Sequence, residues 1–147
     1  MTLFLIHDGE GRINQANKVF VPDKELKAYK TMLGDLGQTY VTVKRAQRLP
    51  SPDHWWVSSG RHKRRPVMKA AALAATIKAG TDAVIVGVPE GASIDVFATG
   101  YYQTPVWSTA ALNGDELAFP MPSPCRYRAL IRRWPYQDCA IDIEAVA

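Results

Sequence analysis

The chain has 147 residues, of which 47% are hydrophobic and 22% are charged, and its formal net charge is +4. This length gives one ordinary domain or two small ones, and the composition is too apolar for a disordered chain. The modest charge falls short of the dense basic face that nucleic-acid-binding proteins usually carry, so we do not expect a nucleic-acid partner. No run of apolar residues is long enough to cross a membrane or to form a signal peptide, so we expect no membrane contact and residence in a cytoplasm.

The first third of the chain predicts short strands around one helix. Residues 3–6 form an apolar strand, a turn with two glycines follows, and residues 12–21 return as a second strand. Asp23 is expected to cap a helix over about residues 23–36. The apolar positions of that helix recur at three- and four-residue spacing and are Leu26, Tyr29, Leu33 and Leu36. Residues 39–43 are β-branched and aromatic, which predicts a third strand.

A hairpin is predicted next, with arms at residues 54–57 and 61–65 around Ser58-Ser59-Gly60. Together with the preceding elements it makes a small α+β domain at residues 1–68. Small residues and an alanine run then replace patterned sequence over residues 66–72, which we interpret as a linker. A second domain occupies residues 69–147.

From residue 73 onward the periodicity is that of strands alone. Val84, Val86 and Val88 are expected to share one face of a strand, and Asn113-Gly114 is the two-residue signal of a type I′ hairpin. About seven short strands, with turns roughly every ten residues, are typical of an immunoglobulin-like sandwich. The predicted fold class is therefore an α+β N-terminal unit followed by an all-β immunoglobulin-like sandwich.

The clearest pattern lies at the end of the chain, where residues 125–133 and 139–145 both alternate with period two. Folding the ribbon at Pro135 places both apolar sets on one face, which predicts an antiparallel hairpin. The expected cross-strand partners are Ile131 with Cys139, Arg128 with Asp142, and Arg126 with Glu144.

The same register argues against a disulfide between the two cysteines. Cys125 lies six residues beyond the partner of Cys139, roughly 20 Å away at about 3.3 Å per residue. A disulfide needs Cα atoms within about 7 Å of each other. We therefore expect two reduced, buried thiols that act as small hydrophobic side chains.

Four pieces of the sequence, in this order, look familiar as a set. They are I-H-D-G-E-G-R-I at residues 6–13, a W-W-V hairpin ending in R-R-P at Pro66, a segment at residues 75–96 that contains G-V-P-E-G-A, and the terminal hairpin with its W-P-Y turn and I-D-I-E-A ending. The set resembles small tail-associated virion proteins that are encoded beside the tail-fibre genes of tailed bacteriophages. In that family a bacterial Ig-like domain follows a short α+β unit.

The resemblance implies a non-enzymatic structural or adaptor component of a phage tail, at the distal tip, the baseplate or the fibre attachment. Such a protein is made in the host cytoplasm and resides in the virion. It contacts other tail or fibre proteins, in repeated symmetric copies. A tail-fibre assembly chaperone, a glycan-binding module for host attachment and a capsid decoration protein are the alternatives.

The residues themselves predict no catalytic site. His7 and Asp8 are neighbours on an extended strand and point to opposite faces, so a role at the turn is expected rather than an acid–base pair. The three histidines, 7, 54 and 62, are scattered and lack ligand spacing, so we expect neither a metal nor a cofactor. Nucleotide-binding and nucleophile-elbow motifs are missing from the sequence, and an enzyme is not expected.

Arginine and aromatic residues near predicted turns have the composition of interface hot spots. The candidates in the second domain are Arg132, Arg133, Trp134 and Tyr136, for which a local cation–π stack is the alternative. The candidates in the first domain are Trp55, Arg61, Arg64 and Arg65, whose alternatives are a solvated hairpin arm and a phosphate contact. A candidate glycan or partner loop contains Tyr101, Tyr102 and Trp107, which could instead line the edge of the core.

Overall fold

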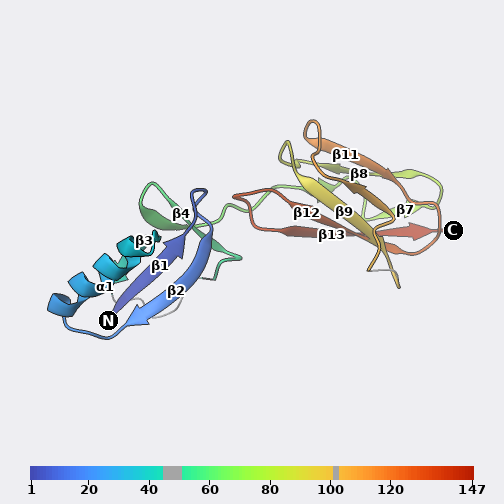
Figure 1. The fold of residues 1–147 in the computed structure, drawn as a ribbon. Helices are drawn as coiled ribbons and strands as arrows, with labels where there is room; N and C mark the ends of the chain where they lie inside the picture. Colours follow the sequence, from blue (N-terminus) through green and yellow to red (C-terminus); the bar gives the residue numbers. More distant parts are fainter. Residues whose placement is uncertain (45–50, 101–102) are drawn as a thin grey trace. The chain divides into compact units, whose positions relative to one another are not determined.

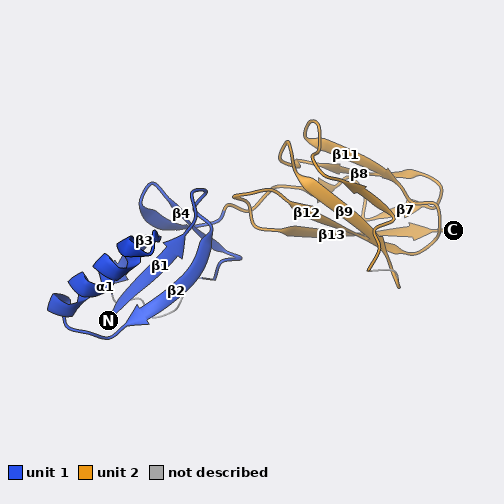
Figure 2. Ribbon diagram, viewed as in Figure 1, with its two compact units in different colours: residues 1–65 blue, residues 66–147 orange. Residues whose placement is uncertain are grey.

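A computed structural model describes residues 1–44, 51–100 and 103–147. The chain divides into two compact units, Met1–Arg65 and Pro66–Ala147 (Figure 2). Strands make up 48% of the described residues, which also contain one short helix, so the fold is mostly β.

A three-stranded antiparallel sheet forms the centre of the first unit (Figure 1). Its order is β2-β1-β3, with β1 at Thr2–His7, β2 at Ile13–Val19 and β3 at Thr39–Lys44. The helix α1, Asp23–Asp35, connects β2 to β3. A separate hairpin of β4, Trp55–Ser58, and β5, Arg61–Arg64, completes the unit.

Both faces of β1 are buried, which explains its uninterrupted apolar run. On one face Phe4 and Ile6 pack against Leu26 and Leu33 of α1. On the other face Leu3 and Leu5 form a second cluster with Ile13 and with Val57 of the hairpin. The first unit therefore has three layers, in which the helix covers one side of the sheet and the hairpin covers the other.

The helix ends differ in part from the prediction. Pro22 occupies the N-cap position without a side-chain hydrogen bond, and Asp23 is the first helical residue rather than the cap. At the other end Gly37 has φ +69°, and the amides of Gly37 and Gln38 donate to the carbonyl oxygens of Gly34 and Leu33, both at 2.9 Å. This is the Schellman arrangement. Leu36 is the C-cap and is 65% exposed, so the prediction that it belongs to the apolar face of the helix was wrong.

Two sheets pack face to face in the second unit. The smaller has the order β11-β8-β6 and the larger has the order β10-β9-β12-β13-β7. The strands among its described residues are β6 Ala71–Ala72, β7 Thr76–Lys78, β8 Asp82–Val86, β9 Ser93–Ala98, β10 Trp107–Thr109, β11 Glu116–Pro120, β12 Arg126–Arg132 and β13 Cys139–Val146. Pairing is antiparallel except between β13 and β7, which run parallel.

One core lies between these sheets and is filled from both. Ile85, Leu117 and Phe119 come from the smaller sheet and are at most 1% exposed. Val96 and Ile131, from the larger sheet, are fully buried against them. Each strand contributes alternate residues to this core, as the period-two pattern requires.

The predicted linker was wrong at residues 71–72, and the hairpin predicted at Asn113-Gly114 was wrong. The alanine run contributes β6, which pairs with β8 inside the second unit, so residues 71–72 are part of the fold. The Asn113-Gly114 pair does not join two neighbouring strands, because β10 pairs with β9 in one sheet and β11 pairs with β8 in the other. Gly114 has φ +90° but Asn113 does not have positive φ, so the type I′ conformation is absent at this described pair.

Of the three valines expected to share one face of β8, Val84 and Val86 do so, and the prediction was wrong for Val88. Ala83 and Ile85 point into the core, whereas Val84 and Val86 are only half-buried on the other face. Val88 is 1% exposed because Gly87, with φ +72°, breaks the alternation between them. Registers with Leu117 and Phe119 of β11 fix the inward side of the strand.

The terminal hairpin has the expected register. Ile131 faces Cys139, Arg128 faces Asp142, and Arg126 faces Glu144. The turn contains a cis peptide bond between Trp134 and Pro135. Cys125 and Cys139 are free thiols, but both are half-buried rather than fully buried as predicted.

Candidate interaction surfaces

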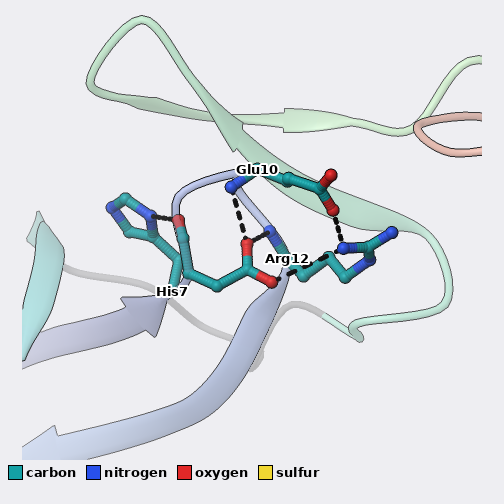
Figure 3. Close-up of polar contacts among 4 residues, drawn as sticks. His7, Glu10 and Arg12 are labelled. Carbon is teal, nitrogen blue, oxygen red and sulfur yellow. Dashed lines mark hydrogen bonds and ion pairs between the residues drawn. The ribbon is translucent and has the colours of Figure 1, made fainter.

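The His7-Asp8 pair lies where β1 turns into β2, and its contacts are those of a turn (Figure 3). The Asp8 carboxylate accepts hydrogen bonds from the backbone amides of Glu10 and Arg12, both at 2.9 Å. The Arg12 guanidinium forms ion pairs with the carboxylates of Asp8 and Glu10. The His7 ring donates from Nδ1 to the Asp8 backbone carbonyl, 2.8 Å away, and not to the carboxylate. Asp8 therefore organises the turn and forms no dyad with the histidine.

Within the described ranges, no three histidine, cysteine, aspartate or glutamate side chains gather where they could hold a metal ion. Burial shifts the pKa of two groups in the second unit, the Cys139 thiol and the Tyr127 hydroxyl. Burial raises the pKa of the Cys139 thiol. Burial also raises the pKa of the Tyr127 hydroxyl, although a hydrogen bond with the Ser123 backbone acts in the opposite direction.

The β4–β5 hairpin holds the first-unit candidates, and its two faces differ. On the inner face Trp55 packs against the cluster around Leu3 and Leu5. The Arg64 guanidinium lies over the Trp55 ring, with Cζ 5.7 Å from the ring centroid, and the His62 ring is 5.5 Å from the same indole. This stack orders the hairpin through a cation–π contact.

Trp56 lies on the other face of the hairpin and is also half-buried. It forms an isolated bridge with Arg12 and lies against Gly11 of the β1–β2 turn. Arg61 and Lys63, cross-strand partners of Ser58 and Trp56, share this face and are exposed. The outward surface of the hairpin therefore combines one indole with two cations.

Arg65 is 8% exposed, which the sequence pattern did not indicate. Its guanidinium donates to the backbone carbonyl oxygens of Pro52 and Asp53, at 3.3 and 3.0 Å, and its amide donates to the His54 carbonyl. Those contacts close the loop that precedes β4. Arg65 thus supports the hairpin from within and offers little surface to a partner.

The four candidate contact residues at the tip of the terminal hairpin have different surroundings. Arg132 forms ion pairs with Asp95 and Asp138, each at 3.7 Å, so carboxylates of the same unit already neutralise its charge. The exposed Arg133 lays its guanidinium against Gly91. Trp134 is half-buried. Tyr136 turns back onto the core and lines a shallow cavity of about 310 Å³ beside Val88.

A further surface on the larger sheet escaped the sequence analysis. Phe97 and Leu130 are half-buried on its outward face, because their neighbours Val96 and Ile131 point into the core. Arg128 faces Phe97 across the β9–β12 pair, and Leu130 faces Asp95. We call Phe97, Leu130 and the surrounding Arg126, Arg128 and Arg132 the outer-sheet face. The alternation of residues in β12 predicts that Leu130 points outward. The position of Phe97 beside it follows only from the pairing of β9 with β12.

The candidate glycan loop is described only in part. Tyr101 and Tyr102 lie outside the described residues. Trp107 is half-buried at the edge of the core, and its ring centroid is 6.1 Å from that of Phe119. The indole therefore packs against the core, which was the alternative to a contact role.

No described helix has the length and apolarity needed to span a membrane. Comparison with known proteins found no matching family model, no similar curated protein and no similar solved structure.

Proposed function

We propose that the second unit is an immunoglobulin-like sandwich. In that fold strands A, B and E share one sheet, strands C, F and G share the other, and a tyrosine near the start of strand F bonds back to the preceding backbone. The sheet orders fit if β6, β8 and β11 are A, B and E, and β9, β12 and β13 are C, F and G. The Tyr127 hydroxyl, at the start of β12, donates to the Ser123 carbonyl at 3.0 Å and accepts from the Ser123 amide at 3.2 Å.

We further propose that the chain is a non-enzymatic structural or adaptor component of a bacteriophage tail. The motif order that resembles small tail-associated virion proteins supports this assignment. The observation that carries it is the outer-sheet face, where two large apolar side chains lie among arginines and carboxylates. Aromatic and arginine residues are enriched at protein interfaces, and a flat sheet surface suits a protein partner better than a small ligand.

On this proposal the outer-sheet face contacts another tail or fibre protein in the virion. Repeated copies follow from the symmetry of a tail. Mass spectrometry of purified particles tests the location, because a structural component stays at a fixed ratio to the major tail protein. A chain that is present in infected cells and missing from purified particles would instead support an assembly chaperone.

The surface itself is tested with paired variants. Phe97→Asp together with Leu130→Asp places two charges in the centre of the outer-sheet face and should reduce incorporation into particles at least tenfold, since a desolvated carboxylate is costly in an interface. Val84→Asp together with Ala118→Asp is the matched control, because these cross-strand partners lie on the outward face of the smaller sheet. Equal incorporation of both variants, with folding intact, would remove the outer-sheet face as the contact.

A further inference from the structure

The two units differ in charge, which the modest total conceals. Residues 1–65 contain 12 lysines and arginines against 6 aspartates and glutamates, a formal charge of +6. Residues 66–147 contain 6 against 8, a formal charge of −2, and the two values give the +4 of the whole chain. The positive potential that could attract an anion therefore belongs to the first unit.

Part of this charge converges on a groove between α1 and β3. The groove has a volume of about 240 Å³ and is lined by Thr2, Asp23, Leu26, Lys27, Lys30, Thr42 and Lys44. Lys27 and Lys30 are one turn apart on the helix and share a face. Lys44 pairs with Thr2 and Thr42 pairs with Phe4, so these residues of β3 lie on the side of the sheet that the helix covers.

The three lysines of the groove are exposed, and no carboxylate of a described residue lies within ion-pairing distance of any of them. Like charges gathered on one concave surface repel one another, and an anion among them relieves that repulsion. The Thr2 and Thr42 hydroxyls add hydrogen-bond donors. The Asp23 carboxylate also lines the groove and is its one negative group among the described residues.

We propose that this groove, which we call the lysine groove, binds a phosphate group. Lysine ammonium groups bind phosphate as point charges, and threonine hydroxyls donate to its oxygens. The volume accommodates one or two phosphate groups and is small for a drug-sized ligand. The lysine groove belongs to the first unit and the outer-sheet face to the second, and the proposal does not depend on the assignment to a phage tail.

Pyrophosphate titrated into the isotope-labelled full chain tests the proposal by NMR. The amide shifts should change at Thr2, Lys27, Lys30, Thr42 and Lys44, and the dissociation constant should rise with salt. Triglutamate at the same charge is the comparison anion. Binding as strong as that of pyrophosphate would overturn the phosphate assignment, and so would shifts scattered over the first unit.

Two sets of variants then distinguish binding in the lysine groove from nonspecific attraction to the positive charge of the first unit. Lys27→Gln, Lys30→Gln and Lys44→Gln together should weaken pyrophosphate binding by at least about tenfold. Lys18→Gln, Arg61→Gln and Lys63→Gln remove the same charge from exposed sites elsewhere in the first unit and should have a much smaller effect. Equal losses in both triple variants would overturn the proposal.

Asp23→Asn supplies a test in the opposite direction. Removal of the one carboxylate should tighten pyrophosphate binding several-fold, because an anion in the groove is repelled by Asp23. Unchanged or weaker binding would place the anion elsewhere. A ten-nucleotide single-stranded DNA identifies the source of the phosphate: tighter binding than pyrophosphate, lost in the groove triple variant, assigns a phosphodiester polymer, and weaker binding assigns a terminal phosphate.

Discussion

Arg128 and Asp142 face each other across the terminal hairpin and are joined by two hydrogen bonds. Arg128 Nε lies 2.8 Å from one carboxylate oxygen of Asp142, and Arg128 Nη2 lies 3.1 Å from the other. Both side chains are partly exposed, at 48% and 41%. The hydrogen bonds from Arg128 lower the pKa of Asp142, and the nearby charge of Arg126 acts in the same direction more weakly.

Arg128→Met should therefore raise the pKa of Asp142 toward its ordinary value of about 3.9. The pair stabilises the fold above that value, and its contribution is lost as the pH falls through the lower pKa of the folded state. We expect a loss of about 0.3–1 kcal/mol near pH 7, because solvent screens a partly exposed pair. NMR titration of the Asp142 carboxyl measures the shift, and Arg126→Met should produce a smaller one. An equal shift in both variants would contradict the dominance of the hydrogen bonds.

Tyr127→Phe should destabilise the second unit by about 0.5–1.5 kcal/mol, because the exposed backbone of Ser123 can bond to water instead. The tyrosine is 2% exposed, and its hydroxyl satisfies both the amide and the carbonyl of Ser123, which would lose a partner. Hydrogen exchange of the β12 amides in the intact chain measures the change. Tyr40→Phe is the control, since the Tyr40 hydroxyl forms no hydrogen bond with any other described residue. Equal exchange in the two variants would show that the Tyr127 hydroxyl contributes nothing.

The terminal hairpin was predictable because local sequence alone specifies it. Both arms alternate without interruption, and a single turn at Pro135 sets the register, so a shift by one residue would expose every apolar side chain. The turn at Pro135 therefore predicts that Arg128 faces Asp142, and the structure confirms this pair. Both strands are also neighbours in sequence, which removes any choice of partner.

Pairing between distant strands was not predictable in the same way. Asn113-Gly114 has the composition of a tight hairpin, yet the strands that flank it belong to different sheets. The face of β8 depends on its partner β11, where Leu117 and Phe119 already point inward, and on the left-handed Gly87. A single sequence gives equal support to either face of a valine-rich strand.

The same limit applies to the candidate contact residues, because their exposure depends on contacts between distant parts of the chain. Arg65 and Tyr136 have the composition of contact residues, but tertiary packing buries the first and turns the second onto the core. Phe97 could be assigned to the outer-sheet face only from the pairing of β9 with β12, which the sequence does not specify. The lysine groove required the fold as well, since Lys44 is far in sequence from Lys27 and Lys30. The division of charge, by contrast, was open to prediction once the boundary between the units was known.

The Cys139 thiol should react more slowly with iodoacetamide than an unhindered cysteine thiol at pH 8. Burial raises its pKa, so less of the reactive thiolate is present at that pH. The rate should continue to rise with pH above the ordinary cysteine value of about 8.5. Mass spectrometry of the Cys125→Ser chain between pH 7 and 10 isolates Cys139, and a rate that levels off below pH 8.5 would contradict the raised pKa.

Gly87→Ala should be among the most damaging small substitutions in the second unit. Gly87 has φ +72°, and an added Cβ would lie 2.5 Å from the Lys69 carbonyl oxygen, so the backbone would have to move. We expect a loss of about 2–4 kcal/mol from overlap and left-handed strain together. Gly80→Ala is the matched control, because Gly80 has φ +89° but nothing within 4 Å of the added carbon, and strain alone should cost about 1–2 kcal/mol. Hydrogen exchange of the β8 amides compares the two variants, and equal losses would mean that the contact with Lys69 has no part in fixing the chain after β8.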